Sequence, residues 1–138
     1  KNKIKVVSHI GITPQKFSDF NKIESVGKNN KDINELILLA GQLEEVGSKF
    51  IVLECVSLTA AKKITKSISI PTIGIGASKY CDGQVLVIDD VLNFNSKSKK
   101  PKFVKNFTNI ENNIVSAVKM FVKEVKSKKF PSRNKSYK

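Results

Sequence analysis

The stretch Phe50-Ile51-Val52-Leu53-Glu54 is a continuous apolar run that ends in a carboxylate. Such a run is typical of a strand that is buried on both faces of a parallel sheet. Similar short runs at residues 4–8, 72–76 and 84–88 predict three more strands. Helical periodicity predicts helices near residues 32–46, 58–68 and 109–127. Buried strands that alternate with amphipathic helices predict a parallel α/β architecture.

Local signals predict where these helices begin and end. Asp32 is placed to cap the first helix, and Gly47 to stop it. Either Ser57 or Thr59 can cap the second helix. Thr108 and Glu111 form a capping box before the third helix. The apolar face of this third helix is predicted to consist of Ile110, Ile114, Val118, Phe121 and Val125.

Polar residues follow the predicted strands at the points where the strands end. They are His9, Glu54, the loop 78–82 and the pair Asp89-Asp90. In (β/α)8-barrel enzymes the carboxyl ends of the strands carry the chemistry, and a flavodoxin-like sheet places its functional loops at the same edge. The position of these residues therefore predicts a site, and it leaves both folds open.

The composition of the 138 residues limits the classes of function. The 40% hydrophobic content is that of a globular protein, and no apolar run reaches the length of a membrane span, so we expect a soluble, cytosolic protein without a membrane partner. Cys55 and Cys81 are expected to be reduced thiols, and with His9 as the single histidine they make an unlikely zinc site.

The formal net charge of +13 could indicate a partner that is a nucleic acid or another anion. Arg133 is, however, the single arginine among 25 basic residues, and the lysines are accompanied by many Asn and Ile residues. Selection for phosphate contacts would favour arginine. We therefore interpret the charge as a compositional bias and keep anion or nucleic-acid binding as a weaker alternative.

Several segments resemble the ketopantoate hydroxymethyltransferase family, and the resemblance covers nearly the whole chain. They are His9-Ile10-Gly11-Ile12-Thr13-Pro14-Gln15, Ile51-Val52-Leu53-Glu54-Cys55-Val56, residues 70–77 running on to Cys81-Asp82-Gly83-Gln84-Val85-Leu86-Val87, Pro101-Lys102-Phe103-Val104-Lys105 and Phe130-Pro131. The resemblance implies strands five to eight of a (β/α)8 TIM barrel, its C-terminal half, in residues 1–127. Residues 128–138 are expected to form a basic, mobile tail, in which Phe130-Pro131 could dock.

The family makes 2-dehydropantoate for pantothenate biosynthesis. It transfers a hydroxymethyl group from methylenetetrahydrofolate to 3-methyl-2-oxobutanoate, with Mg²⁺ as the Lewis acid that stabilises the enolate. By this resemblance Glu54 is the catalytic base, and His9 binds the keto acid. Without the resemblance, Glu54 could equally be a rim carboxylate paired with a lysine, and His9 a donor to a backbone carbonyl. Asp82-Gly83 is expected to form a turn, and Asp89-Asp90 to be structural.

The chain also departs from the family pattern. Ser8, Ser57 and Ser78 replace Gly, Pro and Gly, and Asp89 and Asn93 replace His and Gly. The glycine at the position of Ser78 could be needed for a positive φ. These changes indicate relaxed constraint.

The resemblance also implies that essential residues lie outside this chain. The Mg²⁺ ligands of the family, two aspartates and a glutamate, come from strands one to four, so no metal ligand is expected here. We therefore expect a transferase that is incomplete by itself: a fragment, half of a split enzyme, or a decayed gene product that survives as an assembly partner. The expected partners are the keto acid, folate and an N-terminal half barrel, and the complete enzyme is expected to be a homo-oligomer.

Overall fold

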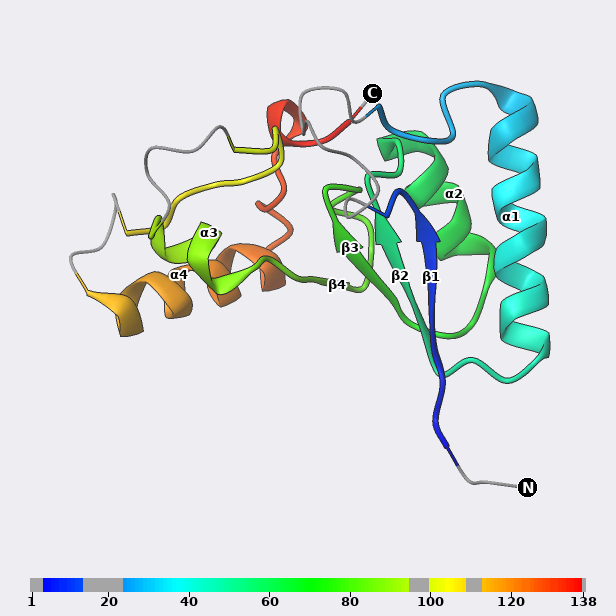
Figure 1. The fold of residues 1–138 in the computed structure, drawn as a ribbon, viewed down its shortest axis with the longest axis horizontal. Coiled ribbons are helices and arrows are strands. Elements are labelled where there is room, and N and C mark those ends of the chain that lie inside the picture. Colours follow the sequence, from blue (N-terminus) through cyan, green and yellow to red (C-terminus); the bar gives the residue numbers. More distant parts are fainter. Residues whose placement is uncertain (1–3, 14–23, 95–99, 109–112, 138) are drawn as a thin grey trace.

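A four-stranded parallel sheet forms the centre of the chain (Figure 1). The computed structural model describes residues 4–13, 24–94, 100–108 and 113–137. The strands follow one another in the order of the sequence: β1 (Val7–Gly11), β2 (Phe50–Glu54), β3 (Thr72–Ile75) and β4 (Gly83–Gln84). The predicted parallel α/β architecture is confirmed.

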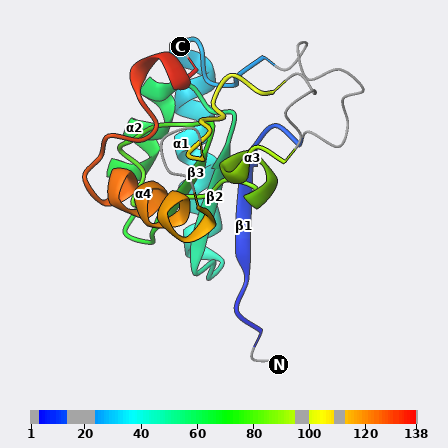
Figure 2. The ribbon, with the colours of Figure 1, turned by 90° about the vertical axis from the view of Figure 1, so that its left-hand side faces the viewer.

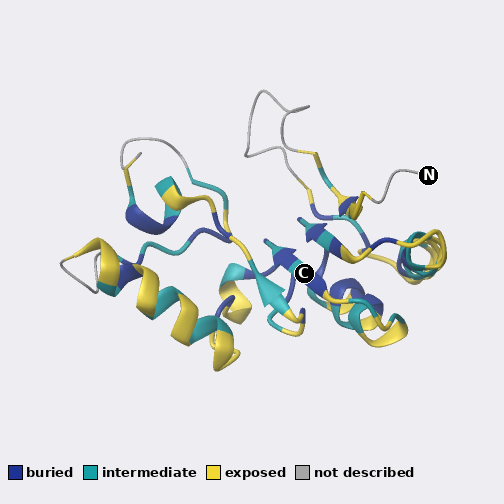
Figure 3. Ribbon diagram, turned by 90° about the horizontal axis from the view of Figure 1, so that it is seen from below, coloured by how far each residue is buried: buried dark blue, intermediate teal, exposed yellow. Residues whose placement is uncertain are grey.

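Helices α1 (Asn30–Glu45) and α2 (Leu58–Ser67) pack together against one face of the sheet (Figures 1 and 3). The buried side chains of β2 on this face, Ile51 and Leu53, join the inner faces of both helices in one apolar core. The predicted inner residues of α1 all belong to this core: Ile33, Leu36, Ile37, Ala40 and Leu43. The helical periodicity of the sequence therefore identified the buried face of α1 correctly.

A side-chain cap begins α1, and a glycine ends it. The cap is Asn29 rather than the predicted Asp32, because the Asn29 side chain accepts from the Asp32 backbone N–H at 2.9 Å. At the other end, the prediction for Gly47 is confirmed. Gly47 has a φ of +98°, and Ser48 N donates to Leu43 O at 3.1 Å. This is a Schellman motif, which turns the chain towards β2.

Ser57, rather than Thr59, is the cap of α2. Its hydroxyl donates to the Gly27 carbonyl at 2.5 Å and accepts from the Ala60 backbone N–H at 3.2 Å. The same side chain thus joins the loop before α1 to the start of α2. Thr59 is exposed.

The prediction of a fourth strand over residues 84–88 is largely wrong. Only Gly83–Gln84 pairs with β3, and Ile88 begins a short helix, α3 (Ile88–Leu92). Val85, Val87 and Ile88 are exposed, and no described strand pairs with the outer edge of β4. A short apolar run has the same pattern in a buried strand and at the start of a helix. β1 also lies three residues later than predicted, at the register that pairs it with β2.

The last long helix, α4 (Ile114–Lys126), begins later than predicted. Its cap is Asn113, which accepts from the Ser116 backbone N–H at 2.8 Å. Thr108 instead bonds to Asn106, and Glu111 lies outside the described residues, as does Ile110. The predicted inner face is partly wrong because Ile114 and Val118 are exposed (Figure 3).

A second apolar core lies between α3, α4 and the C-terminal segment (Figure 2). Phe107, Phe121 and Phe130 pack edge to face, with ring centroids 5.6–5.8 Å apart. Phe130-Pro131 does dock, since both residues are buried. The segment ends with η3 (Arg133–Lys135) and Tyr137, whose carbonyl accepts from Leu58 N at 3.0 Å. The boundary predicted at residue 127 and the mobility of the segment beyond it stay predictions.

None of the helices in the described ranges combines the length and the apolar character that crossing a membrane requires.

We expect Ser57→Ala to lower the free energy of unfolding by about 1–2 kcal/mol, because it removes the cap of α2 and leaves the Gly27 carbonyl without its donor. Urea unfolding of the two chains measures this difference. Thr59→Ala is the matched control, and its exposed side chain should change stability by less than about 0.5 kcal/mol. Equal losses in the two variants would contradict the assignment of the cap.

Candidate active site

His9 and Glu54 meet at the carboxyl ends of two neighbouring parallel strands. His9 lies in β1, and Glu54 is the last residue of β2. Side chains alternate between the two faces of a strand, so Ile10, Ile51 and Leu53 enter the core with α1 and α2. His9 and Glu54 are therefore on the opposite face of the sheet, which no described helix covers.

The imidazole Nε2 of His9 is 3.0 Å from Oε2 of Glu54. This contact confirms the prediction that the two side chains meet from adjacent strands. An ionised carboxylate only accepts hydrogen bonds, so Nε2 carries the proton in that state and Nδ1 is the acceptor nitrogen of the ring. The Glu54 side chain is 18% exposed and the His9 side chain 38% exposed. The pair is thus half-buried and open to a small molecule.

Gly11 allows the end of β2 to lie close against β1. It is the residue directly opposite Glu54 in the pairing of β1 with β2. Gly11 also has a φ of +122°, and a Cβ at this position would lie 2.0 Å from the Glu54 carbonyl oxygen. No other residue fits here without moving the end of β2.

The backbone directly after Glu54 has a left-handed conformation at Cys55, with a φ of 52°. Such a φ costs roughly 1 kcal/mol in a non-glycine residue and persists where neighbouring groups enforce it. Cys55 N donates to Ile75 O at 3.0 Å, and Cys55 O accepts from Val26 N at 3.1 Å. Burial raises the pKa of the Cys55 thiol to about 11, so the thiol stays protonated at neutral pH.

The other acidic candidates do not join this pair. Asp82 accepts from the Thr72 backbone N–H at 2.8 Å and from its hydroxyl at 3.1 Å, so it fixes the turn before β4 to the start of β3. Asp89 and Asp90 lie in the first turn of α3, where carboxylates are favoured by the helix dipole. Burial raises the pKa of Asp90. These positions are consistent with the structural roles expected for all three residues.

The segment Gly74-Ile75-Gly76 permits close packing. A Cβ on Gly74 would lie 2.7 Å from the Gln84 side chain, and one on Gly76 would lie 2.4 Å from the Phe103 ring. The concern about Ser78 was wrong. It is buried without a positive φ, and its carbonyl accepts from the Gln84 side chain at 2.7 Å. The serine therefore fits its backbone.

Within the described ranges no three His, Cys, Asp or Glu side chains gather closely enough to hold a metal ion. His9 and Glu54 provide two candidate donors, whereas Mg²⁺ requires a near-octahedral set of oxygen ligands. The described residues thus do not fit a Mg²⁺ site.

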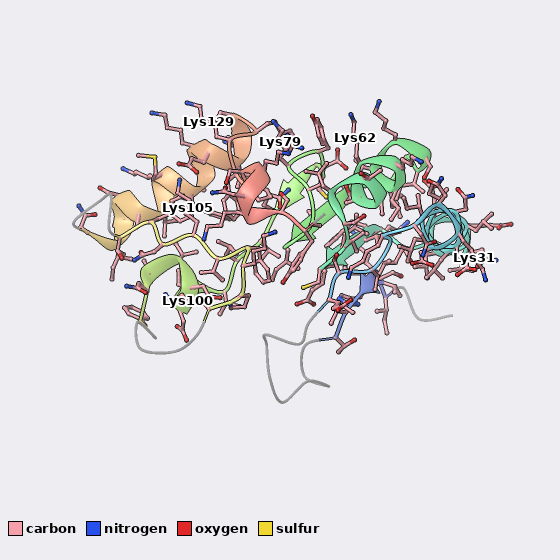
Figure 4. All side chains as sticks on the ribbon, turned by 90° about the horizontal axis from the view of Figure 1, so that it is seen from above. Lys31, Lys62, Lys79, Lys100, Lys105 and Lys129 are labelled. Atoms are coloured by element: carbon pink, nitrogen blue, oxygen red, sulfur yellow. The ribbon has the colours of Figure 1, made fainter. Side chains whose placement is uncertain are left out.

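The lysines are spread over the surface rather than gathered on one element. The six lysines labelled in Figure 4 come from α1, α2 and three separate loop segments. Some interact within the chain: Lys105 pairs with Glu124 at 2.5 Å, and Lys62 lies 4.5 Å from the centre of the Tyr80 ring. This distribution favours the interpretation of the charge as a compositional bias.

The sequence did not indicate the contacts that hold the end of β2. Tyr137, from the segment expected to be mobile, packs in the same apolar core as Cys55, and its carbonyl accepts from Leu58 N at 3.0 Å. Val26 forms an isolated parallel bridge with Val56 on the other side. The local sequence signal was Tyr137, an aromatic residue among basic and polar ones. Such a signal is too weak to identify a long-range contact.

Comparison with known proteins shows which family the chain matches. The family model described as ketopantoate hydroxymethyltransferase matches residues 1–133. A 3-methyl-2-oxobutanoate hydroxymethyltransferase from Clostridium botulinum (strain 657 / Type Ba4) is 50% identical over all 138 residues. The protein of the same name from Wigglesworthia glossinidia brevipalpis is 42% identical over 134 residues, 97% of this chain.

The chain spans about half of the length of these relatives, 50% in the first case and 51% in the second. Within that half, the match runs through both strands that carry His9 and Glu54. The family match and the identity along the full chain therefore show that the chain belongs to the ketopantoate hydroxymethyltransferase family.

Proposed function

We propose that this chain forms the C-terminal half of a (β/α)8 barrel that transfers a hydroxymethyl group from methylenetetrahydrofolate to 3-methyl-2-oxobutanoate. The product is 2-dehydropantoate, a precursor in pantothenate biosynthesis. The observation that carries the proposal is the 3.0 Å contact between His9 and Glu54 at the ends of adjacent parallel strands. The names of the relatives support the reaction.

Several features support the half-barrel interpretation. The strands are parallel and follow the order of the sequence, as consecutive strands of a barrel do. Both outer strands have a free edge among the described residues, and the face with His9 and Glu54 has no covering layer. Four strands are half of a barrel, and the chain is half as long as its relatives. Closing such a sheet would pair both free edges.

Glu54 is proposed as the catalytic base. Its carboxylate accepts the C3 proton of the keto acid, and the electron pair of the C–H bond remains in the enolate. The enolate carbon then forms the new C–C bond to the one-carbon unit of the folate, the bonds between that carbon and the folate nitrogens break, water supplies the hydroxyl, and tetrahydrofolate leaves. A half-buried carboxylate at the end of an apolar strand suits this role, since it is accessible to substrate and partly shielded from water.

His9 is proposed to orient Glu54 and the keto acid. With Nε2 bonded to the Glu54 carboxylate, Nδ1 is the ring nitrogen left for the substrate, and it donates to an oxygen of the keto acid when the imidazole carries both protons. Glu54 is thus assigned the removal of the proton, and His9 is assigned the orientation of the substrate.

Mg²⁺ is assigned to the part of the relatives' length that this chain does not span, because the described residues do not form a ligand set. We assign no step of the reaction to the metal in this chain. A non-catalytic role as an assembly partner is the alternative. It differs from the main proposal in predicting no proton exchange after reconstitution.

We expect the isolated chain not to bind 3-methyl-2-oxobutanoate tightly in the presence of Mg²⁺, because its described residues form no set of oxygen ligands for the metal. Titration calorimetry of the purified 138-residue chain with the keto acid, with and without Mg²⁺, tests this expectation. Mg²⁺-dependent binding with a micromolar Kd would place the metal site within this chain and contradict the assignment.

We expect Glu54→Gln to slow the exchange of the C3 proton with solvent deuterium by roughly 10²–10⁴-fold, with little change in keto-acid binding. The assay combines this chain with the N-terminal half of the Clostridium botulinum relative and follows exchange by NMR. His9→Asn should weaken keto-acid binding more than it slows exchange. Asp89→Asn, which changes a half-buried carboxylate on α3, is the control.

Unchanged exchange in the Glu54→Gln pair would move the base to another residue. Absence of exchange with the unsubstituted chain, in spite of a stable complex between the halves, would favour the non-catalytic alternative.

A further inference from the structure

Helix α4 carries more apolar surface than the described residues cover. Its inner side packs in the second core through Ala117, Met120, Phe121 and Val125. The next side chains around the helix are also apolar but are 36–61% exposed: Ile114, Val115, Val118 and Val122. These four residues form one continuous stripe beside the inner side, here called the α4 stripe. Single exposed apolar residues are common, whereas a continuous apolar stripe marks an interaction surface.

The α4 stripe belongs to the side of the molecule where the sheet ends in β4. α4 contacts β4, and Figure 1 shows α3 and α4 beyond the β4 edge of the sheet, whereas α1 lies at the opposite end. No described strand pairs with the outer edge of β4, and Val85 and Val87, just after β4, are exposed. A free strand edge, exposed apolar side chains beside it and the helix with the α4 stripe therefore lie on the same side of the molecule.

The handedness of β/α connections indicates what fits beside β4. In a parallel sheet, a strand, its helix and the next strand form a right-handed crossover, so the helix packs over its own strand and the next one. α1 follows this rule, because it follows β1 and shares one core with Ile10 of β1 and Ile51 of β2. α4 follows β4, for which the described residues provide no next strand. The α4 stripe therefore has the position of a surface that packs on a further parallel strand.

The length of the relatives favours one occupant of this surface. The chain covers 50% of the Clostridium botulinum relative, so the rest of that protein is about as long as this chain. It is therefore long enough to supply further strands and helices. A second copy of this chain fits less well, because each copy has a formal net charge of +13 and like charges repel.

We propose that the α4 stripe and the free edge of β4 are the docking surface for the N-terminal half of the barrel. The first strand of that half pairs with β4 in parallel, and apolar side chains of this strand and of its helix cover the α4 stripe. The proposal rests on the proposed function for the existence of that half, but docking is measured without any reaction.

Two cysteine substitutions on α4 test this docking. Val118→Cys places a thiol in the α4 stripe. Lys123→Cys, the matched control, places a thiol on the exposed polar side of the same helix, about 140° away around its axis. Each substitution is made in the 138-residue chain and in a chimera that has the N-terminal half of the Clostridium botulinum relative fused before Lys1. The natural Cys55 and Cys81 are buried, so their slow labelling shows that this part of each protein is folded.

The readout is the rate of alkylation by N-ethylmaleimide at each cysteine, separated by peptide mass mapping. The thiol of Val118→Cys should react readily in the isolated chain and roughly tenfold or more slowly in the chimera, because the docked strand and helix exclude the reagent. The thiol of Lys123→Cys should react at the same rate in both proteins.

A binding measurement with the two halves as separate chains gives a second readout. The double variant Val118→Ser/Val122→Ser should weaken binding of the N-terminal half by roughly 10–100-fold, since it removes two apolar side chains that docking buries. The urea midpoint of this variant alone should match that of the unsubstituted chain, because both side chains are exposed. Leu38→Ser, which removes an exposed apolar side chain from α1, is the control and should leave binding unchanged.

Equal labelling of Val118→Cys in the isolated chain and in the chimera, with Cys55 and Cys81 still protected, would overturn the proposal. Equal protection of Val118→Cys and Lys123→Cys would do the same. Protection of Val118→Cys in the isolated chain at high protein concentration would assign the α4 stripe to a second copy instead. Docking without exchange of the C3 proton would refute the proposed reaction and leave the docking surface standing, whereas exchange without protection of Val118→Cys would refute the docking surface alone.

Discussion

Two peptide groups at the end of β2 connect the ends of three strands. The Glu54 carbonyl accepts from Ile12 N, just after β1, and Cys55 N donates to Ile75 O, the end of β3. Cys55 O accepts from Val26 N in the loop before α1. Since backbone groups removed from water must be paired, these bonds determine where the strands stop and which side chains stand at the rim. Glu54 is held by this arrangement, and its carboxylate meets the imidazole of His9 from the neighbouring strand.

Much of this arrangement could be predicted from the sequence. β2 was placed correctly from its apolar run, although burial on both faces was wrongly predicted, since only Ile51 and Leu53 are fully buried. α1 was placed correctly because its periodic residues all face one core. His9 and Glu54 were expected together because parallel strands bring their carboxyl ends to one edge. The side-chain pattern of Val85 to Ile88 could not distinguish a strand from the start of α3, since the outcome depends on what covers that edge. The buried face of α4 was also predicted partly wrongly, because it too depends on which elements cover the helix.

The part of the site that the sequence did not reveal consists of long-range contacts. The packing of Tyr137 in one core with Cys55 depends on the docking of Phe130-Pro131 and on the ring of Phe103, so no local pattern around Tyr137 indicates it. The left-handed φ of Cys55 is likewise set by its neighbours, because nothing in the residue type favours it. The family match accounts for the presence of these segments in one chain. The hydrogen bonds and packing contacts between the segments account for the geometry that each imposes on the next.

The two apolar cores differ in how far apart their residues lie in the sequence. The core beneath α1 and α2 is assembled from one continuous stretch of alternating strands and helices, residues 10–81. The second core joins Ile12, Cys55 and Ile75 to side chains as distant as Phe130 and Tyr137. Contacts between distant residues carry a larger loop-closure entropy and form late in folding. The sheet can therefore assemble before the geometry around Glu54 is complete. In that order of folding, the scaffold reaches its final form first and the site reaches it second.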